Sequence, residues 1–339
     1  MQGNNGASSW RDRTVLVTGV GGFVGSGLAA ELVRRGASVV GIVRDSQGLR
    51  LLDRLGLTDR LDIVRGSISE PGLVHRAVNE YEVDTVFHLA AQAIVGVANR
   101  SPISTFESNI AGTWHLLEAA RNGRMVQRVV VASSDKAYGD QPVLPYTEDT
   151  SLAGSYPYDA SKVCTDVLAR SYAVSYQLPV AIVRCANIYG PGDLNWSRLI
   201  PGTIRSALEG QHPVIRSDGS PERDYLYLED AVDGYLRVAD SLPNQRGQAF
   251  NLGTAQAISA LSLVREILAT VGDSRLEPRI LGQAKGEIDR QSLSAVKASR
   301  VLGWTPRTSL RLGLQKTVDW YLDYLMVGAG ARVLEEALA

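Results

Sequence analysis

Short apolar runs alternate with segments of helical period through the first half of the chain. The runs are rich in Val, Ile, Leu and Thr, as strands are, and fall at residues 14–17, 39–43, 61–64, 85–89 and 128–132. Helix-compatible segments lie between them, one ending near residue 35 and another at residues 105–121. Strands separated by helices form parallel sheets covered on both faces, and right-handed crossovers then predict a doubly wound α/β fold.

After residue 149 the pattern changes. A long helix is predicted at residues 157–176 and a sixth strand at 180–184. Beyond residue 192 the elements become short and mixed, at residues 199–208, 214–216, 225–228, 236–239 and 249–252. This indicates a smaller mixed α/β lobe over the carboxyl edge of the sheet, where ligands of such folds bind. We expect residues 1–11 to be a disordered leader, 12–190 mainly the larger lobe, 191–326 mainly the smaller lobe with some exchange of chain, and 327–339 a helical tail.

Composition excludes several classes of protein. The chain has 339 residues, with 35 basic and 36 acidic side chains, so its charge indicates neither nucleic-acid nor membrane-surface binding. No apolar run approaches the roughly 18 residues of a membrane span. Cys164 and Cys185 lack metal-ligand spacing, so no metal site is expected, and two reduced thiols suit a cytoplasmic protein.

A glycine-rich turn follows the first predicted strand and opens the first helix. Gly19, Gly22 and Gly25 have a GxxGxxG spacing, with Phe23 and Val24 between the last two. Such glycines permit the tight turn, the approach of a pyrophosphate to the backbone, and close packing of helix on strand, while the helix N-terminus attracts the anion. The larger lobe is therefore predicted to be a Rossmann-type dinucleotide-binding domain.

The end of the second strand bears on the choice of dinucleotide. A carboxylate there accepts from the ribose 2′-hydroxyl of NAD, whereas an arginine accommodates the 2′-phosphate of NADP. The chain has both, as Arg44 and Asp45. We favour NAD, and NADP is not excluded.

A YxxxK pattern begins the predicted helix at residues 157–176. Its spacing brings Tyr158 and Lys162 onto one helical face. A nearby ammonium is expected to lower the pKa of the phenol and so produce a base for a sugar hydroxyl. The pattern is common in isolation, but here Ser134 precedes it at the end of the fifth strand.

These motifs together resemble the extended short-chain dehydrogenase/reductase family. The resemblance rests on the glycine-rich turn, HLAAQ at residues 88–92, Ser134, YDASK at 158–162, NIYGPG at 187–192 and RDY at 223–225. It implies that Ser134, Tyr158 and Lys162 form a hydride-transfer triad acting on nucleotide sugars. It also implies a homodimer through residues 105–121 and 158–176, and a cofactor site that includes Ser67, Ile68, Leu89, Ala90, Ala91 and Cys185.

The two residues after Ser134 distinguish among the reactions of the family. Simple 4-epimerases usually have small or neutral residues there, whereas this chain has Asp135 and Lys136. Sugar 4,6-dehydratases need such a pair, and Asp-Lys resembles the CDP-glucose 4,6-dehydratases, which implies Asp135 as general acid and Lys136 as C5 base. The alternatives are a 4-epimerase or a 5,6-dehydratase on the same triad, a structural ion pair, and a nucleotide-binding scaffold without turnover.

Guanidinium groups in the smaller lobe are candidates for binding a pyrophosphate, because their planar fork matches phosphate oxygens. By resemblance, the substrate contacts are Gln92, Asn187, Arg198, Leu199, Val214, Arg216, Arg223 and Lys285. The sequence departs from the family's usual residues at two places, which affect the expected cofactor affinity and the identity of the substrate's nucleotide base. Ser67-Ile68 replaces the usual Asp-Ile or Asp-Val near adenine, and residues 284–287 read AKGE where many relatives have RPGD.

Overall fold

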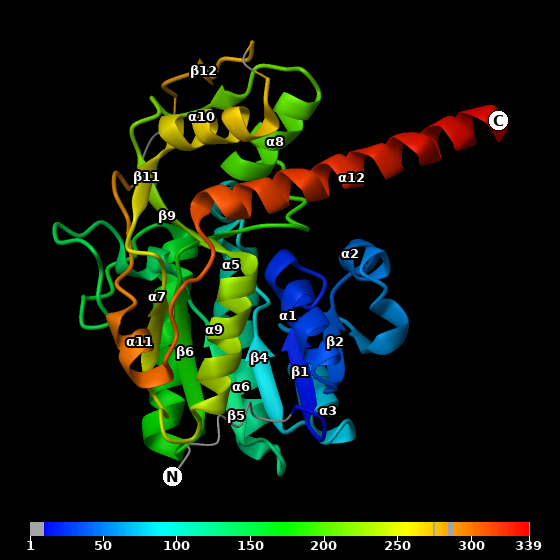
Figure 1. The fold of residues 1–339 in the computed structure, drawn as a ribbon. Helices are drawn as coiled ribbons and strands as arrows, with labels where there is room; N and C mark the ends of the chain where they lie inside the picture. The colour runs from blue at the N-terminus through cyan, green and yellow to red at the C-terminus, as the bar shows by residue number, and fades with distance from the viewer. Residues whose placement is uncertain (1–9, 274, 284–287, 339) are drawn as a thin grey trace, which may run out of the picture.

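The computed structural model describes residues 10–273, 275–283 and 288–338, and its centre is a seven-stranded parallel sheet (Figure 1). The strand order is β10-β6-β5-β4-β1-β2-β3, which confirms the doubly wound α/β fold. The strands are β1 (Thr14–Thr18), β2 (Ser38–Val43), β3 (Asp62–Arg65), β4 (Thr85–His88), β5 (Arg128–Ala132), β6 (Val180–Cys185) and β10 (Ala249–Leu252).

Helices cover both faces of this sheet, because its strands are apolar on both sides. On one face α1 (Phe23–Arg34) and α9 (Leu228–Asp240) share a core with Val15 and Val17 of β1. On the other, α3 (Pro71–Glu80), α6 (Gly112–Asn122) and α7 (Pro157–Tyr176) share a core with Leu16 of the same strand. Alternate residues of β1 thus face opposite cores, as the pleat requires.

The prediction allowed some exchange of chain between the lobes, and the structure identifies one place where it occurs. Residues 236–239 and 249–252 were assigned to the smaller lobe, but they belong to α9 and β10, and β10 pairs parallel with β6. The crossover α9 therefore returns the chain to the larger lobe after the first part of the smaller one. An apolar run of four residues does not reveal which sheet it joins, so the sequence pattern could not show this return.

In the part of the smaller lobe that the structure describes, short strands combine with three helices. One sheet has the order β11-β9-β7, from Ala257–Ser259, Glu222–Tyr227 and Asn187–Tyr189, and a second pairs β12 (Arg279–Ile280) with β8 (Val214–Ile215). The helices are α8 (Leu199–Leu208), α10 (Ala260–Val271) and α12 (Leu310–Leu338), and α12 extends beyond the body of the molecule (Figure 1).

Short elements connect these parts. They are η1 (Ser46–Gly48), α2 (Leu49–Arg54), η2 (Thr58–Arg60), α4 (Val95–Arg100), α5 (Pro102–Phe106), η3 (Glu107–Ala111), η4 (Asp135–Tyr138) and α11 (Val296–Leu302). The predicted helix at 105–121 is thus three joined segments with a π-helical turn at η3.

The start of the described chain corrects one boundary. Trp10 was placed in the disordered leader, but its side chain is buried, packs against Phe87 and lies under the Arg13 guanidinium. Burial of a large aromatic ring is favourable enough to order the chain from this residue onward. Residues 1–9 of the predicted leader lie outside the described residues.

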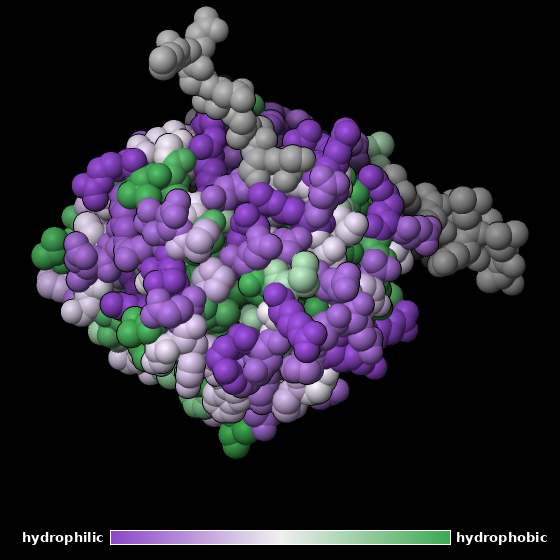
Figure 2. Space-filling model, turned by 90° about the horizontal axis from the view of Figure 1, so that it is seen from below, coloured by the Kyte–Doolittle hydropathy of each residue, from purple (hydrophilic) through white to green (hydrophobic). Residues whose placement is uncertain are grey.

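The face opposite the smaller lobe is mainly hydrophilic, with hydrophobic residues scattered singly or in small groups (Figure 2). Among the described helices, none is both long and apolar enough to cross a bilayer.

Candidate active site

A cavity of about 1440 Å³ lies between the lobes, at the carboxyl ends of β1, β4, β5 and β6. Parallel sheets bind ligands at this edge, where the strand order reverses between β1 and β4. All the predicted site residues but two line it: Gly19, Gly22, Phe23, Val24, Gly25, Arg44, Asp45, Ser67, Ile68, Leu89, Ala90, Ala91, Ser134, Asp135, Lys136, Tyr158, Lys162, Cys185, Asn187, Arg198, Leu199, Val214, Arg216 and Arg223.

The two exceptions are Gln92 and Lys285. Gln92 was predicted to contact substrate, but it is not among the cavity-lining residues. Its side-chain oxygen accepts from the Ile94 amide within its own loop, and its backbone is held by Asn109. The substrate contact of Gln92 therefore remains a prediction. Lys285 lies outside the described residues.

The glycine-rich turn leaves no room for side chains where backbones meet. Gly19 has a φ of +70°, and a Cβ on it would lie 2.8 Å from the Ala90 backbone. A Cβ on Gly25 would lie 2.1 Å from the Gly19 oxygen, so helix α1 packs on the turn as predicted. By contrast, a Cβ on Gly22 would meet only the Gly19 oxygen, at 3.2 Å, which leaves this side of the turn to the cavity. This cradle fits a pyrophosphate.

One glycine was missed. A Cβ on Gly21 would lie 2.1 Å from the carbonyl oxygen of Gly48, so the loop after β2 approaches the turn through Gly21. The glycine doublet at 21–22 was the available signal.

The Arg44–Asp45 pair is fixed by local contacts at the end of β2. One carboxylate oxygen of Asp45 accepts from the Gln47 and Gly48 amides at 3.1 and 3.3 Å. The other pairs with the Arg44 guanidinium at 3.2 Å. The Arg44 hydrogen bond lowers the pKa of Asp45, so the carboxylate is ionised and available as an acceptor at the cavity.

Behind the cavity, a buried chain of hydroxyls and imidazole holds the end of β4. The Thr18 hydroxyl accepts from the Leu89 and Ala90 amides, so it donates its own proton to Nδ1 of His88 at 2.9 Å. The other ring nitrogen then donates to Thr113, at 3.0 Å. Burial lowers the pKa of His88 to about 3, so the ring is neutral and fixes the backbone at the predicted nicotinamide position.

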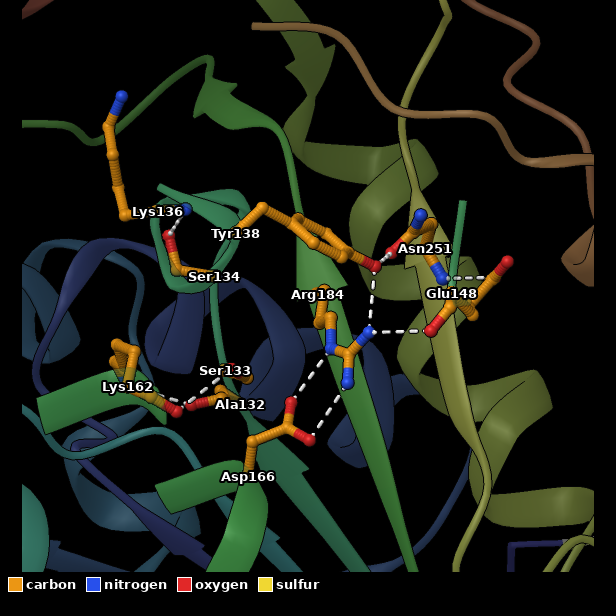
Figure 3. Close-up of polar contacts among 10 residues, drawn as sticks. All are labelled: Ala132, Ser133, Ser134, Lys136, Tyr138, Glu148, Lys162, Asp166, Arg184 and Asn251. Atoms are coloured by element: carbon orange, nitrogen blue, oxygen red, sulfur yellow. Dashed lines mark hydrogen bonds and ion pairs between the residues drawn. The ribbon is translucent and has the colours of Figure 1, made fainter. Parts of the chain in front are cut away.

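Tyr158 and Lys162 both face the cavity from α7. The Lys162 ammonium lies 6.0 Å from the centroid of the Tyr158 ring and donates to the Ala132 carbonyl oxygen at 2.7 Å (Figure 3). Burial raises the pKa of Tyr158 to about 12, a shift that its hydrogen bond with Ser134 partly opposes, and burial lowers that of Lys162 to about 8. The expected lowering of the Tyr158 pKa is therefore absent in the protein by itself, because burial and the Asp135 and Asp159 charges outweigh the Ser134 hydrogen bond and the Arg198 charge.

Asp135 and Lys136 lie in η4, directly after the β5 end. Ser134 caps this turn by accepting from the Lys136 amide at 3.2 Å, and donates to the Asp135 carboxylate at 2.9 Å. The Lys136 ammonium donates to the side-chain oxygen of Gln291, a residue that sequence reasoning did not identify. Asp159, also missed, is buried beside this turn. Burial raises its pKa to about 6, and Asp135 adds to the shift, whereas the Lys136 charge opposes it.

A buried polar network connects η4 to the neighbouring strands and to α7. The Tyr138 ring leads from η4 to Arg184 on β6 and Asn251 on β10 (Figure 3). Arg184 donates to both carboxylate oxygens of Asp166 on α7, at 2.8 and 2.9 Å. The network thus joins the turn that carries Lys136 to the helix that carries Tyr158.

The candidate substrate-binding arginines of the smaller lobe are held in place by contacts within the protein. Arg198 pairs with the buried Asp193 at 2.9 Å, and Arg223 donates to the Glu222 and Asp289 carbonyl oxygens. Both guanidinium groups are thereby oriented at the cavity.

Two other kinds of chemistry, metal binding and thiol catalysis, can be compared with the residues present. Within the described ranges no group of three or more His, Cys, Asp or Glu residues could hold a metal ion. Burial raises the pKa of Cys185 to about 12, so this residue is a neutral thiol.

Comparison with known proteins places these features in a family. The model of the NAD dependent epimerase/dehydratase family matches residues 15–253. A dTDP-glucose 4,6-dehydratase of Shigella flexneri is 32% identical over 336 residues, covering 91% of this chain and 92% of the relative. A UDP-glucose 4-epimerase of Mycolicibacterium smegmatis is 33% identical over 309 residues, covering 90% and 97%.

The solved structures similar to this chain likewise include both an epimerase and a dehydratase. UDP-glucose 4-epimerase from Thermotoga maritima, crystallised with UDP-glucose, has a TM-score of 0.84 at 29% identity and covers 92% of this chain and 99% of its own. A double mutant of the dTDP-glucose 4,6-dehydratase DesIV from Streptomyces venezuelae, with NAD and DAU bound, has a TM-score of 0.82 at 30% identity and covers 91% of this chain and 96% of its own.

Proposed function

We propose, from the premise that this chain belongs to the NAD-dependent epimerase/dehydratase family, that it is a nucleotide-sugar 4,6-dehydratase. The observation that carries the proposal is the Asp135–Lys136 pair, which lines the same cavity as Tyr158 and directly follows Ser134. Overall similarity does not separate the two reactions, since a dehydratase and an epimerase are 32% and 33% identical to this chain.

The proposed reaction divides between two groups of residues. Tyr158, beside Ser134, receives the proton of the C4 hydroxyl as C4 is oxidised. Lys136 then removes the C5 proton, which the new ketone acidifies, and Asp135 protonates the departing C6 hydroxyl so that one water is lost. Lys136 returns a proton to C5 when hydride is delivered to C6. Bound NAD, for which the glycine cradle and the neighbouring Asp45 are suited, supplies the hydride acceptor at C4, a positive ring that favours the Tyr158 phenolate, and the hydride returned to C6.

The phosphate-binding part of the proposal rests on Arg198 and Arg223. Both line the cavity on the side of the smaller lobe, and each is oriented by a fixed acceptor rather than by solvent alone. Val214 and Arg216 lie at the same cavity in and after β8, where the nucleotide base of the substrate is proposed to lie. The Asp-Lys pair makes a CDP-hexose the first substrate to try.

The test incubates the purified protein with CDP-, dTDP-, UDP- and GDP-hexoses and follows product mass and the redox state of the cofactor. Loss of one water without net reduction of NAD supports dehydration. A product of unchanged mass with inverted C4 selects the epimerase instead. Tyr158→Phe should abolish both outcomes.

A second variant separates the steps. Lys136→Met should keep the exchange of hydride at C4 while stopping water loss, because Tyr158 and Lys162 remain in place. Water loss at the wild-type rate in this variant would remove the proposed role of Lys136.

A further inference from the structure

Gln291 is a fully buried amide, and both ends of its side chain contact the turn that carries Asp135 and Lys136. Its oxygen accepts from the Lys136 ammonium, and its nitrogen donates to the Asp135 carbonyl oxygen at 3.5 Å. Burying an amide is costly unless it is hydrogen-bonded. The side chain thus satisfies its hydrogen bonds with a turn that lies 155 residues earlier in the sequence.

The backbone around Gln291 is held on both sides. Its amide donates to the Glu222 carbonyl oxygen at 3.1 Å, and the Leu293 amide donates to the Asp224 carboxylate at 3.2 Å. Between them, the Ser292 carbonyl oxygen accepts from the Tyr146 amide at 2.8 Å. A side chain anchored in this way presents its oxygen at a fixed position, without reorganisation when a ligand binds.

We propose that Gln291 is a positioning residue for Lys136, holding its amine in place to remove the C5 proton; this rests on the proposed dehydratase function. A neutral amine can donate one N–H to the amide oxygen and keep its lone pair for the substrate proton. The ammonium formed by that transfer still has the same acceptor. Gln291 itself neither gains nor loses a proton.

An amide suits this task better than a carboxylate would. A carboxylate at the same place would stabilise the ammonium over the amine and so weaken the base. Among the described residues, Asp159 on α7 interacts electrostatically with Lys136 and Asp135 adjoins it on η4, whereas Arg290, next to Gln291, is paired with Glu222 at 2.7 Å. A carboxylate at position 291 would therefore add a further negative charge to this part of the site.

The competing explanation is that Gln291 only ties its segment to η4. Two variants of similar size distinguish the explanations. Gln291→Glu keeps the shape and the acceptor but adds a charge, and Gln291→Met keeps the bulk and removes the acceptor. The matched control is Gln248→Glu, because Gln248 accepts from the Lys297 ammonium at 2.9 Å and neither residue lines the cavity.

The measurements are incorporation of solvent deuterium at C5, water loss, exchange of hydride at C4, and melting temperature. We expect Gln291→Glu to move the acidic limb of the pH profile for C5 exchange about one to three pH units upward, as a new ion pair does. Gln291→Met should lower kcat for water loss about 10- to 100-fold, the effect of a misplaced catalytic group, with KM unchanged. Both should retain hydride exchange at C4, and Gln248→Glu should behave as the wild type.

The outcomes separate this inference from the proposed function. A wild type that loses water, with Gln291 variants that keep its pH profile and its kcat, would overturn the inference alone. Variants that lose C4 exchange and C5 exchange in equal proportion would also overturn it, since they indicate a general structural defect. A wild type that inverts C4 without losing water would overturn the proposed function, and the inference with it.

Discussion

Removing the carboxylate of Asp166 tests whether the buried network holds the active-site turn in place. Asp166 and Arg184 have exposed fractions of 0% and 2%, and their two hydrogen bonds of 2.8 and 2.9 Å are bidentate. Asp166→Asn leaves a guanidinium in the interior without its counter-charge, which costs about 3–5 kcal/mol of unfolding free energy. With a melting entropy of about 2.1 cal/mol/K per residue, a chain of this length should melt about 4–7 °C lower.

The assay is differential scanning calorimetry, with NAD binding and water loss measured on the same samples. Because Tyr138 bonds to Arg184 and belongs to the turn that carries Lys136, water loss should fall more than NAD affinity does. The control is Asp273→Asn, whose partner Arg275 is 86% exposed, and little change is expected there. The double change Asp166→Leu with Arg184→Met should recover most of the lost stability, since it removes both charges. A melting temperature of Asp166→Asn within about 1 °C of the wild type would refute the reasoning.

Three further predictions concern the cofactor turn, pH and assembly. Gly25→Ala should abolish NAD binding, measured by calorimetric titration, because its Cβ would lie 2.1 Å from the Gly19 oxygen, whereas Gly72→Ala, with no atom within 4 Å, should bind NAD normally. The pKa of His88 is about 3 in the folded protein and 6.5 ordinarily, so the neutral imidazole contributes fully to stability above pH 6.5, and this contribution is lost as the pH falls toward 3. The variant His88→Asn should therefore flatten that part of the curve of melting temperature against pH. On α7, Val167 and Val174 are 56% and 74% exposed, so we propose that a second copy covers this helix; Val167→Asp with Val174→Asp should convert a dimer to a monomer by light scattering, and an unchanged mass would contradict this.

Local patterns predicted the larger lobe well because its signals are local. The strand at residues 128–132 and the helix at 157–176 have the predicted bounds, since each combines an apolar run with a clear start and end. The pairing of β10 with β6 could not be predicted, because the two strands are separated by the first part of the smaller lobe. The same holds for Trp10, whose burial depends on Phe87, distant in the sequence.

The site residues, too, were predictable where their signal is a short local motif and not where it depends on distant contacts. Glycine spacing and YxxxK are short motifs, and all their members line the cavity. Gln291 had no signal, because a lone glutamine after a charged segment is ordinarily a surface residue. Gln92 is the opposite case: it belongs to a motif, but its oxygen accepts from the Ile94 amide two residues later, within its own loop, and its substrate contact remains a prediction.

In the proposed function, hydride chemistry and proton chemistry are carried by different elements, and this makes the proposal separable by mutation. Tyr158 and Lys162 lie on α7, whereas Asp135 and Lys136 lie on η4 and are held by Gln291 and Ser134. An enzyme that only inverts C4 needs the first set and gains nothing from burying an acid beside a lysine, since buried charges are costly unless they are paired or used. Asp135 is 3% exposed, and the Lys136 ammonium donates to a neutral amide while it also interacts electrostatically with the Asp159 carboxylate. A lysine kept only for an ion pair would be best served by a carboxylate in place of Gln291, so the amide at this position favours a base over a structural cation.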